Sequence, residues 1–268
     1  SARFVPDINI RRAIMSTLNP QDCVDYYGGS GASVIYRPMS KTLKKYYPTE
    51  AGPYYTYDET GKTALDLAKL SGCTVGSDGK LRDKDGKRLK YTFTIAGNSD
   101  DHPANAMLNH AREILNRVGF DIEISYDSTA LSKLSSGLLT VWAAAWSSSS
   151  DPDMYQVYHK NSTATSTLAW GYTRLKSANA TPYERNKLTA LSNKIEEARE
   201  YTEAGDRAPL YHEALDMLMD LAVEFPTYQR KVYYVWKKGV LNEKSLFPKV
   251  DTYRSPLSEI WNVSFNEG

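Results

Sequence analysis

LLTVWAAAWSSSSDPD, residues Leu138–Asp153, is the stretch of sequence that decides the expected fold. Its first nine residues are almost wholly apolar and do not alternate with polar ones, which is typical of a strand covered on both faces in a parallel sheet. The next seven are Ser, Asp and Pro, which predict a polar loop at the carboxyl end of that strand. Ligands of open α/β sheets bind outside the carboxyl ends of the strands. Trp146 and the hydroxyls and carboxylates after it are therefore predicted to contact a ligand, with a place in the hydrophobic core as the alternative for Trp146.

The preceding region alternates strands and helices. Apolar residues alternate with polar ones from Leu89 to Ile95 and again from Phe120 to Tyr126, as in strands. Between them, Met107 to Val118 carry an apolar stripe at helical spacing. We expect a parallel pair joined by a right-handed crossover, followed by a short helix and the strand at Leu138. The predicted fold class is α/β, with a mainly parallel central sheet flanked by helices.

Further helices are predicted on both sides of this unit. Asp7 is expected to cap the first, in which Ile10, Ile14 and Leu18 recur at helical spacing. The others are expected after Asn19-Pro20, from Asp58 to Gly72, around residues 155–158, and at about 182–201 and 206–224.

The segments between and beyond these helices are expected to be loops, turns and short strands. Residues 28–56 have no sustained period and are interpreted as a surface excursion, and Lys84–Lys87 as a hairpin turn between short strands. Residues 161–181, rich in Ser, Thr and Asn, are expected to form a loop that contains Trp170. Residues 232–236, VYYVW, are predicted as a strand, and no regular element is expected after them.

Composition excludes several classes of partner. The 268 residues include 33 basic and 32 acidic ones, so a net charge of +1 gives no bulk field that favours nucleic acid or an anionic membrane. No apolar run approaches the roughly 18 residues that a membrane helix needs. Cys23 and Cys73 are too few for a disulfide framework; one bridge between them is allowed, but two buried free thiols are the favoured interpretation.

Candidate catalytic and metal-binding groups are few. Asp151 and Asp153 are a carboxylate pair of the kind that acid–base catalysis uses, although Asp-Pro-Asp is also a common turn former and that interpretation is favoured. The His residues show no spacing typical of metal ligands, so no metal site is predicted. Gly61-Lys62-Thr63 lacks the earlier Gly of a phosphate loop, and Lys62 is expected to be a solvated helix residue.

Four segments, in their order and spacing, resemble the extracellular solute-binding proteins of ABC importers, family 5, whose members bind oligopeptides, dipeptides or nickel. They are DINIRRAI at 7–14, Tyr57-Asp58 with 64–72, Trp146 through Asp153, and residues 207–228. These are similar to the family's VRqAl helix, its YDpekAkeLLaeAG segment, its W…DPd loop and its "R..ly.ea..il.e.aP.iply" segment. The family's segments belong to the second half of longer chains. The resemblance therefore implies that residues 1–226 form the second lobe, and that residues 227–268 form a lobe-crossing strand and a C-terminal extension that returns to a missing first lobe.

The resemblance implies binding without a cofactor and without turnover. Family members hold a solute between two lobes that close by hinge bending, and deliver it to a membrane permease. In peptide-binding members an Asp three residues after the loop Trp meets the α-amino group of the ligand; here that position is Ser149. A hydroxyl cannot neutralise a buried ammonium, so a neutral solute such as an oligosaccharide gains support beside a peptide, unless Asp151 compensates. The expected ligand-binding residues are Trp146, Ser148, Ser149, Ser150, Asp151 and Tyr228, with interlobe packing as the alternative role for the last.

The leading hypothesis is the ligand-binding lobe of an importer's solute-binding protein. It is expected to act as a monomer at the extracellular face of a bacterial cytoplasmic membrane, in the periplasm or as a lipoprotein on the cell surface. The alternatives are a ligand-sensing domain of a regulator, or a hydrolase that uses Asp151 and Asp153. An isolated lobe leaves half of the cleft open, so weak or undetectable ligand binding is expected of these 268 residues.

Overall fold

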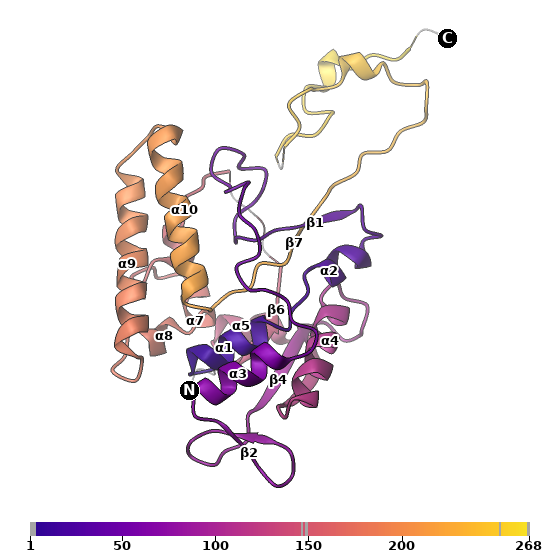
Figure 1. The fold of residues 1–268 in the computed structure, drawn as a ribbon. Coiled ribbons are helices and arrows are strands. Elements are labelled where there is room, and N and C mark those ends of the chain that lie inside the picture. The colour runs from indigo at the N-terminus through magenta and orange to yellow at the C-terminus, as the bar shows by residue number, and fades with distance from the viewer. Residues whose placement is uncertain (1–3, 146, 148–149, 252, 267–268) are drawn as a thin grey trace.

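A parallel sheet lies at the centre of the α/β unit (Figure 1). The computed structural model describes residues 4–145, 147, 150–251 and 253–266. Within them the sheet has the strand order β5-β4-β6, and β4 pairs in parallel with both neighbours. The strands are β4 (Lys90–Ala96), β5 (Asp121–Asp127) and β6 (Val141–Ala143). The predicted α/β class with a parallel central sheet is confirmed.

Three helices pack on this sheet and form the first hydrophobic core. They are α1 (Ile8–Met15), α3 (Lys62–Leu70) and α4 (Asn105–Arg117). Phe93 and Ile95 of β4 are completely buried against Leu115 of α4. Asp7 caps α1 as predicted: its Oδ1 accepts hydrogen bonds from the backbone N–H groups of Asn9 and Ile10, at 2.8 and 3.2 Å. This cap fixes where the chain enters the core.

Smaller elements surround the first core. They are α2 (Gln21–Tyr26), α5 (Ala130–Ser135) and the antiparallel pair of β2 (Thr74–Val75) and β3 (Leu81–Arg82). Residues 76–80 connect β2 to β3. The predicted turn at 84–87 follows β3, and the chain folds back there through an antiparallel bridge between Arg82 and Arg88. Lys62 is a solvated residue of α3 that pairs with Asp66, as expected.

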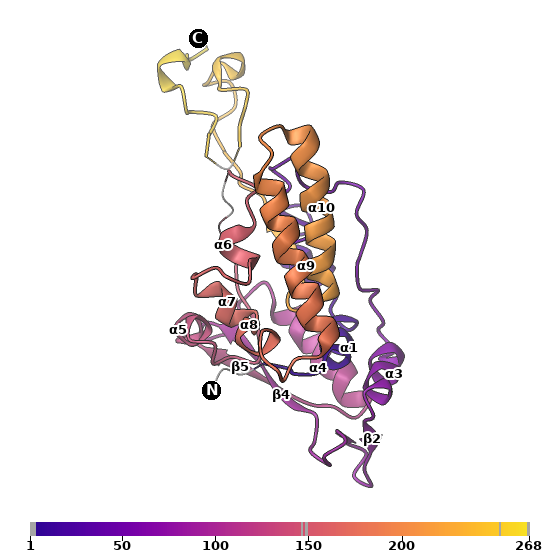
Figure 2. The same cartoon turned by 90° about the vertical axis from the view of Figure 1, so that its left-hand side faces the viewer.

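A second, largely helical unit stands beside the sheet (Figures 1 and 2). Its long helices α9 (Pro182–Arg199) and α10 (Ala204–Asp220) confirm the two that the sequence predicts. Three short helices complete it: α6 (Tyr155–Tyr158), α7 (Ser166–Ala169) and α8 (Tyr172–Leu175). Residues 161–181 are therefore not simply a loop, because Trp170, Tyr172 and Leu175 are buried in the second hydrophobic core.

Arg11 joins the two units through a buried ion pair. Its Nη2 lies 2.7 Å from Oε1 of Glu184, the residue that completes the capping box of α9. The guanidinium also donates to the carbonyl oxygens of Leu221 and Ala222, which follow α10. Burial alone would raise the pKa of Glu184, but the hydrogen bonds from Arg11 and Thr181 hold that pKa below its ordinary value. The pair is therefore charged on both sides, and each charge depends on the other.

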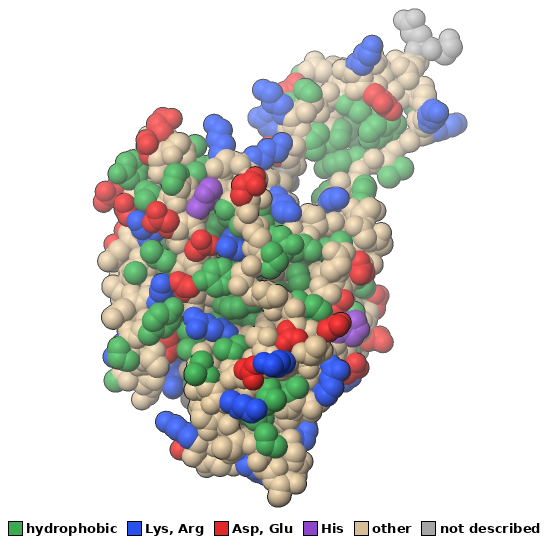
Figure 3. Space-filling model, in the orientation of Figure 1, with side chains coloured by type: hydrophobic (Ala, Val, Ile, Leu, Met, Phe, Trp, Pro, Cys, Tyr) green, Lys and Arg blue, Asp and Glu red, His purple; other side chains and the backbone are tan. Residues whose placement is uncertain are grey.

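An antiparallel ribbon leads to the C-terminal segment. It consists of β1 (Ala32–Val34), inside the excursion of residues 28–56, and β7 (Tyr228–Arg230). The predicted strand at 232–236 is wrong: pairing with β1 ends at Arg230, and Val235 is 92% exposed. Beyond β7 the chain extends away from the body and contains short 3-10 turns at Glu243–Ser245 and Ile260–Asn262 (Figures 1 and 3).

The strand predicted from residue 138 also needs correction. β6 is shorter than the apolar run and lies at an edge of the described sheet, where only β4 pairs with it. Its residues are half-buried rather than covered on both faces, and Leu138 is exposed. Leu138 instead closes the turn that ends α5, since its N–H donates to the carbonyl oxygen of Lys133.

Candidate functional site

The predicted binding loop leaves β6 at the carboxyl edge of the parallel sheet. Of its expected ligand-binding residues, Trp146, Ser148 and Ser149 lie outside the described residues. Ser150 and Asp151 are exposed. Oδ1 of Asp151 lies 3.8 Å from a guanidinium nitrogen of Arg207 in the first turns of α10. The loop therefore spans from the sheet edge to the beginning of α10.

Asp151 and Asp153 adopt turn-forming geometry. The carboxylate of Asp151 accepts a hydrogen bond from the N–H of Asp153 at 2.9 Å, and that of Asp153 accepts one from the N–H of Tyr155 at 3.0 Å. Asp153 also lies 3.2 Å from Arg199 at the end of α9. These contacts support the turn-forming interpretation of Asp-Pro-Asp over a catalytic pair.

Tyr228 contacts α2 through Tyr27. Their rings lie 5.4 Å apart and their hydroxyl oxygens 3.3 Å apart. Burial and this hydrogen bond raise the pKa of Tyr228. Its half-buried ring also packs against the first core. The structure thus places Tyr228 against Tyr27 and the first core, and Asp151 beside the helical unit. The ligand-binding and interlobe-packing roles expected of Tyr228 both stay predictions.

Glu224 is a carboxylate that the sequence did not single out. It accepts a hydrogen bond from the hydroxyl of Tyr158 at 2.7 Å, and the ring of Tyr158 stacks on Trp170. The ring of Trp142, on β6, lies 5.4 Å from the ring of Trp170. Burial raises the pKa of Glu224 to about 7, although the hydrogen bond from Tyr158 lowers it. A titratable group thus lies at the end of an aromatic row that begins on β6.

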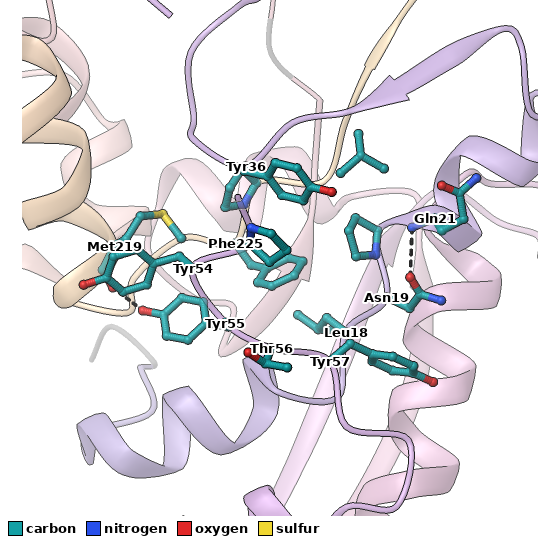
Figure 4. A pocket seen from close by; sticks show the side chains of 14 residues that line it. Leu18, Asn19, Gln21, Tyr36, Tyr54, Tyr55, Thr56, Tyr57, Met219 and Phe225 are labelled. Carbon is teal, nitrogen blue, oxygen red and sulfur yellow. Dashed lines mark hydrogen bonds between the residues drawn. The ribbon is translucent and has the colours of Figure 1, made fainter. Parts of the chain in front are cut away.

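A cavity of about 390 Å³ lies below the β1–β7 ribbon (Figure 4). It is bounded by the α1–α2 connection, the residues after β1, the segment before α3 and the residues around the end of α10. Its lining residues are Leu18, Asn19, Pro20, Gln21, Val34, Tyr36, Pro53, Tyr54, Tyr55, Thr56, Tyr57, Met219, Phe225 and Pro226. Sequence reasoning missed this cavity because its walls come from four separate segments; the abundance of Tyr was the only signal.

Within the part of the chain that the structure describes, no group of three or more His, Cys, Asp or Glu residues is arranged to hold a metal ion. Cys23 and Cys73 are both buried and are not bonded to each other. Burial raises the pKa of the Cys23 thiol to about 12, so this thiol is protonated and unreactive at neutral pH.

Comparison with known sequences identifies the family to which this α/β fold belongs. The profile of the bacterial extracellular solute-binding proteins, family 5, middle region, matches residues 2–167. The chain belongs to this family. No curated protein matches the chain as a relative.

Solved structures show the same fold. The oligopeptide-binding protein AppA from Bacillus subtilis, in complex with a nonapeptide, is 17% identical with a TM-score of 0.66, over 84% of this chain and 42% of AppA. NikZ from Campylobacter jejuni, in complex with Ni(L-His), is 17% identical with a TM-score of 0.63, over 84% and 42%. An oligopeptide-binding protein from Thermus thermophilus, in complex with a pentapeptide, is 18% identical with a TM-score of 0.65, over 88% and 40%. The chain thus spans about two fifths of the length of these proteins.

None of the described helices is both long enough and apolar enough to cross a lipid bilayer.

Proposed function

We propose that this chain is the ligand-binding lobe of an ABC importer's solute-binding protein, and that it captures a peptide or similar small solute for a membrane permease. The observation that carries the proposal is the family match over residues 2–167, joined to a polar loop at the carboxyl edge of a parallel sheet. Ligands of such sheets bind at that edge. The protein binds and releases its solute without turnover, on the extracellular side of the membrane.

The loop from Trp146 to Asp151 is the proposed ligand face. Structures similar to this chain hold a nonapeptide, a pentapeptide and Ni(L-His), which are all small solutes. Ser149 replaces the carboxylate that the family's peptide-binding loop uses, and Asp151 is exposed and close enough in sequence to take over part of that role. A peptide and an uncharged oligosaccharide are both candidate ligands.

A second lobe is proposed to complete the cleft. Residues 1–226 form the lobe described here, and residues 227–268 cross to the other one. The C-terminal segment supports this division, because it leaves the body with apolar side chains in the open (Figure 3). Val235, Trp261 and Phe265 are 92%, 77% and 73% exposed. Exposed apolar groups in such number indicate a surface that another part of the protein covers.

Calorimetry on two forms of the protein tests the proposal. We expect a peptide or oligosaccharide to bind the full-length protein, and to bind these 268 residues weakly or undetectably, because one lobe leaves half of the cleft open. Trp146→Ala in the full-length protein should weaken ligand binding at least tenfold, because it removes the proposed stacking surface, whereas Leu70→Ala at the exposed end of α3 should leave binding unchanged. Micromolar peptide binding by the 268 residues alone, or equal affinities in both variants, would contradict the proposed site.

A further inference from the structure

The cavity below the β1–β7 ribbon has no charged side chain among its lining residues. We propose that it binds an uncharged aromatic molecule, at a place separate from the loop after β6. An ammonium or carboxylate that entered would lose its hydration without gaining an ion pair, which is costly. A flat uncharged ring would instead replace water against apolar walls. The volume of about 390 Å³ lies in the range of small-molecule sites.

The aromatic walls of the cavity are held in place by hydrogen bonds at their outer ends. Tyr54 donates to the carboxylate of Asp220, and Tyr55 donates to the carbonyl oxygen of Met219. Their rings are 5.2 Å apart in an edge-to-face arrangement, and Tyr55 lies 6.4 Å from Phe225. Because these rings are already ordered, a ligand that packs on them does not bear the entropy of fixing them.

Tyr36 supplies a polar group to the cavity. Its hydroxyl makes no hydrogen bond to another described residue. In Figure 4 this hydroxyl is directed into the space between the lining side chains, whereas the hydroxyl of Tyr57 is directed away from them. A hydroxyl both donates and accepts, so an uncharged ring that carries an N–H or a carbonyl group finds a partner here.

The cavity lies far from the predicted loop. Asp151 of the loop contacts Arg207 near the beginning of α10, whereas Met219 borders the cavity at the other end of this helix. Twelve residues of α-helix separate these two positions by about 18 Å. An occupant of the cavity therefore leaves the loop accessible, and the two sites can be tested separately.

Fluorine NMR with a matched set of indoles tests the proposal on the 268-residue chain. The probes are 5-fluoroindole, which is neutral, 5-fluorotryptamine, a cation, and 5-fluoroindole-3-acetate, an anion. We expect 5-fluoroindole to bind with a submillimolar Kd, and the two charged probes to bind at least tenfold more weakly. Equal affinities for the three probes, or no binding of 5-fluoroindole, would overturn the proposal.

Two Thr→Trp variants locate the bound probe. Thr56 is exposed at the lining of the cavity, so Thr56→Trp places an indole in the opening and should weaken probe binding at least tenfold. Thr49→Trp adds the same side chain at an exposed position outside the lining and should have no effect. Tyr36→Phe, which keeps the ring, should weaken binding by about threefold to tenfold through a lost hydrogen bond. If Thr56→Trp and Tyr36→Phe both bind 5-fluoroindole like the original chain, the probe binds elsewhere and the proposal is wrong.

Discussion

Replacing Glu224 by Gln should stabilise the protein at pH 8 and leave its stability unchanged at pH 4.5. The carboxyl group of Glu224 accepts a hydrogen bond from Tyr158, and no cation contributes to its pKa, which burial raises to about 7. Gln has nearly the same shape and keeps an oxygen that accepts from Tyr158. The substitution therefore removes the buried negative charge and little else.

The pH dependence follows from proton binding in the two states. The unfolded chain releases the Glu224 proton near the ordinary pKa of 4.5, and the native state holds it until about pH 7. Between these values the native state binds more protons, so the free energy of unfolding falls as pH rises. The shift corresponds to about 3 kcal/mol at most. This loss is complete above pH 7, and the Glu224→Gln variant does not suffer it.

Urea unfolding of both proteins at pH 4.5, 6 and 8, followed by circular dichroism, measures the difference. Burial lowers the pKa values of His102 and His159, so these two residues destabilise the native state as pH falls. This is opposite to the effect of Glu224. Because both proteins contain both His residues, the His contribution cancels in the difference between their free energies of unfolding. Glu59→Gln, at an exposed position, serves as control and should show no pH-dependent difference. A Glu224→Gln protein no more stable than the original at pH 8 would refute the reasoning.

Three further substitutions test what holds the fold together, each by urea unfolding at pH 7. Glu184→Gln leaves the Arg11 guanidinium buried without its counter-ion and should cost about 3–5 kcal/mol; a loss below about 1 kcal/mol would show that the pair is dispensable. Gly171→Ala places a methyl group against the Phe4 ring at a φ of +71°, so it should cost at least about 1 kcal/mol, and Phe4→Ala should recover part of this in the double variant. Asp7→Ala removes two hydrogen bonds at the start of α1 and should cost about 1 kcal/mol; an unchanged stability would mean that water replaces the cap.

Local patterns predicted the parts of the fold that depend on local interactions. Asp7 indicates where α1 begins, and the apolar stripe of α4 and the alternation in β4 and β5 indicate which faces of these elements are buried. Each of these elements forms where the sequence predicts it. The long helices α9 and α10 were found for the same reason. The family resemblance carried by these segments was confirmed by the match over residues 2–167.

Non-local pairing accounts for what the sequence did not predict. β7 ends at Arg230, and not at 236, because its partner is β1, about 200 residues earlier in a segment with no strand pattern of its own. Residues 161–181 are polar in composition, yet three large side chains suffice to bury part of them as α7 and α8. The cavity and Glu224 depend on contacts between distant segments in the same way. The expected roles of Trp146, Ser148 and Ser149 remain predictions, since these residues lie outside the described ranges.

The charges around the proposed ligand face favour an uncharged solute, which leads to a last prediction within the proposed function. Asp151 lies 3.8 Å from Arg207 and Asp153 lies 3.2 Å from Arg199, so each acidic residue of the loop has a basic partner nearby. Ser149 adds a hydroxyl where the family's peptide-binding loop has a carboxylate.

A loop of this kind has little net charge to offer the ammonium group of a peptide. If a peptide binds the full-length protein, acetylation of its amino terminus, which removes that charge, should therefore change the Kd measured by calorimetry less than threefold. A tenfold loss on acetylation would show instead that Asp151 exchanges Arg207 for the ligand, and that the loop neutralises an ammonium after all.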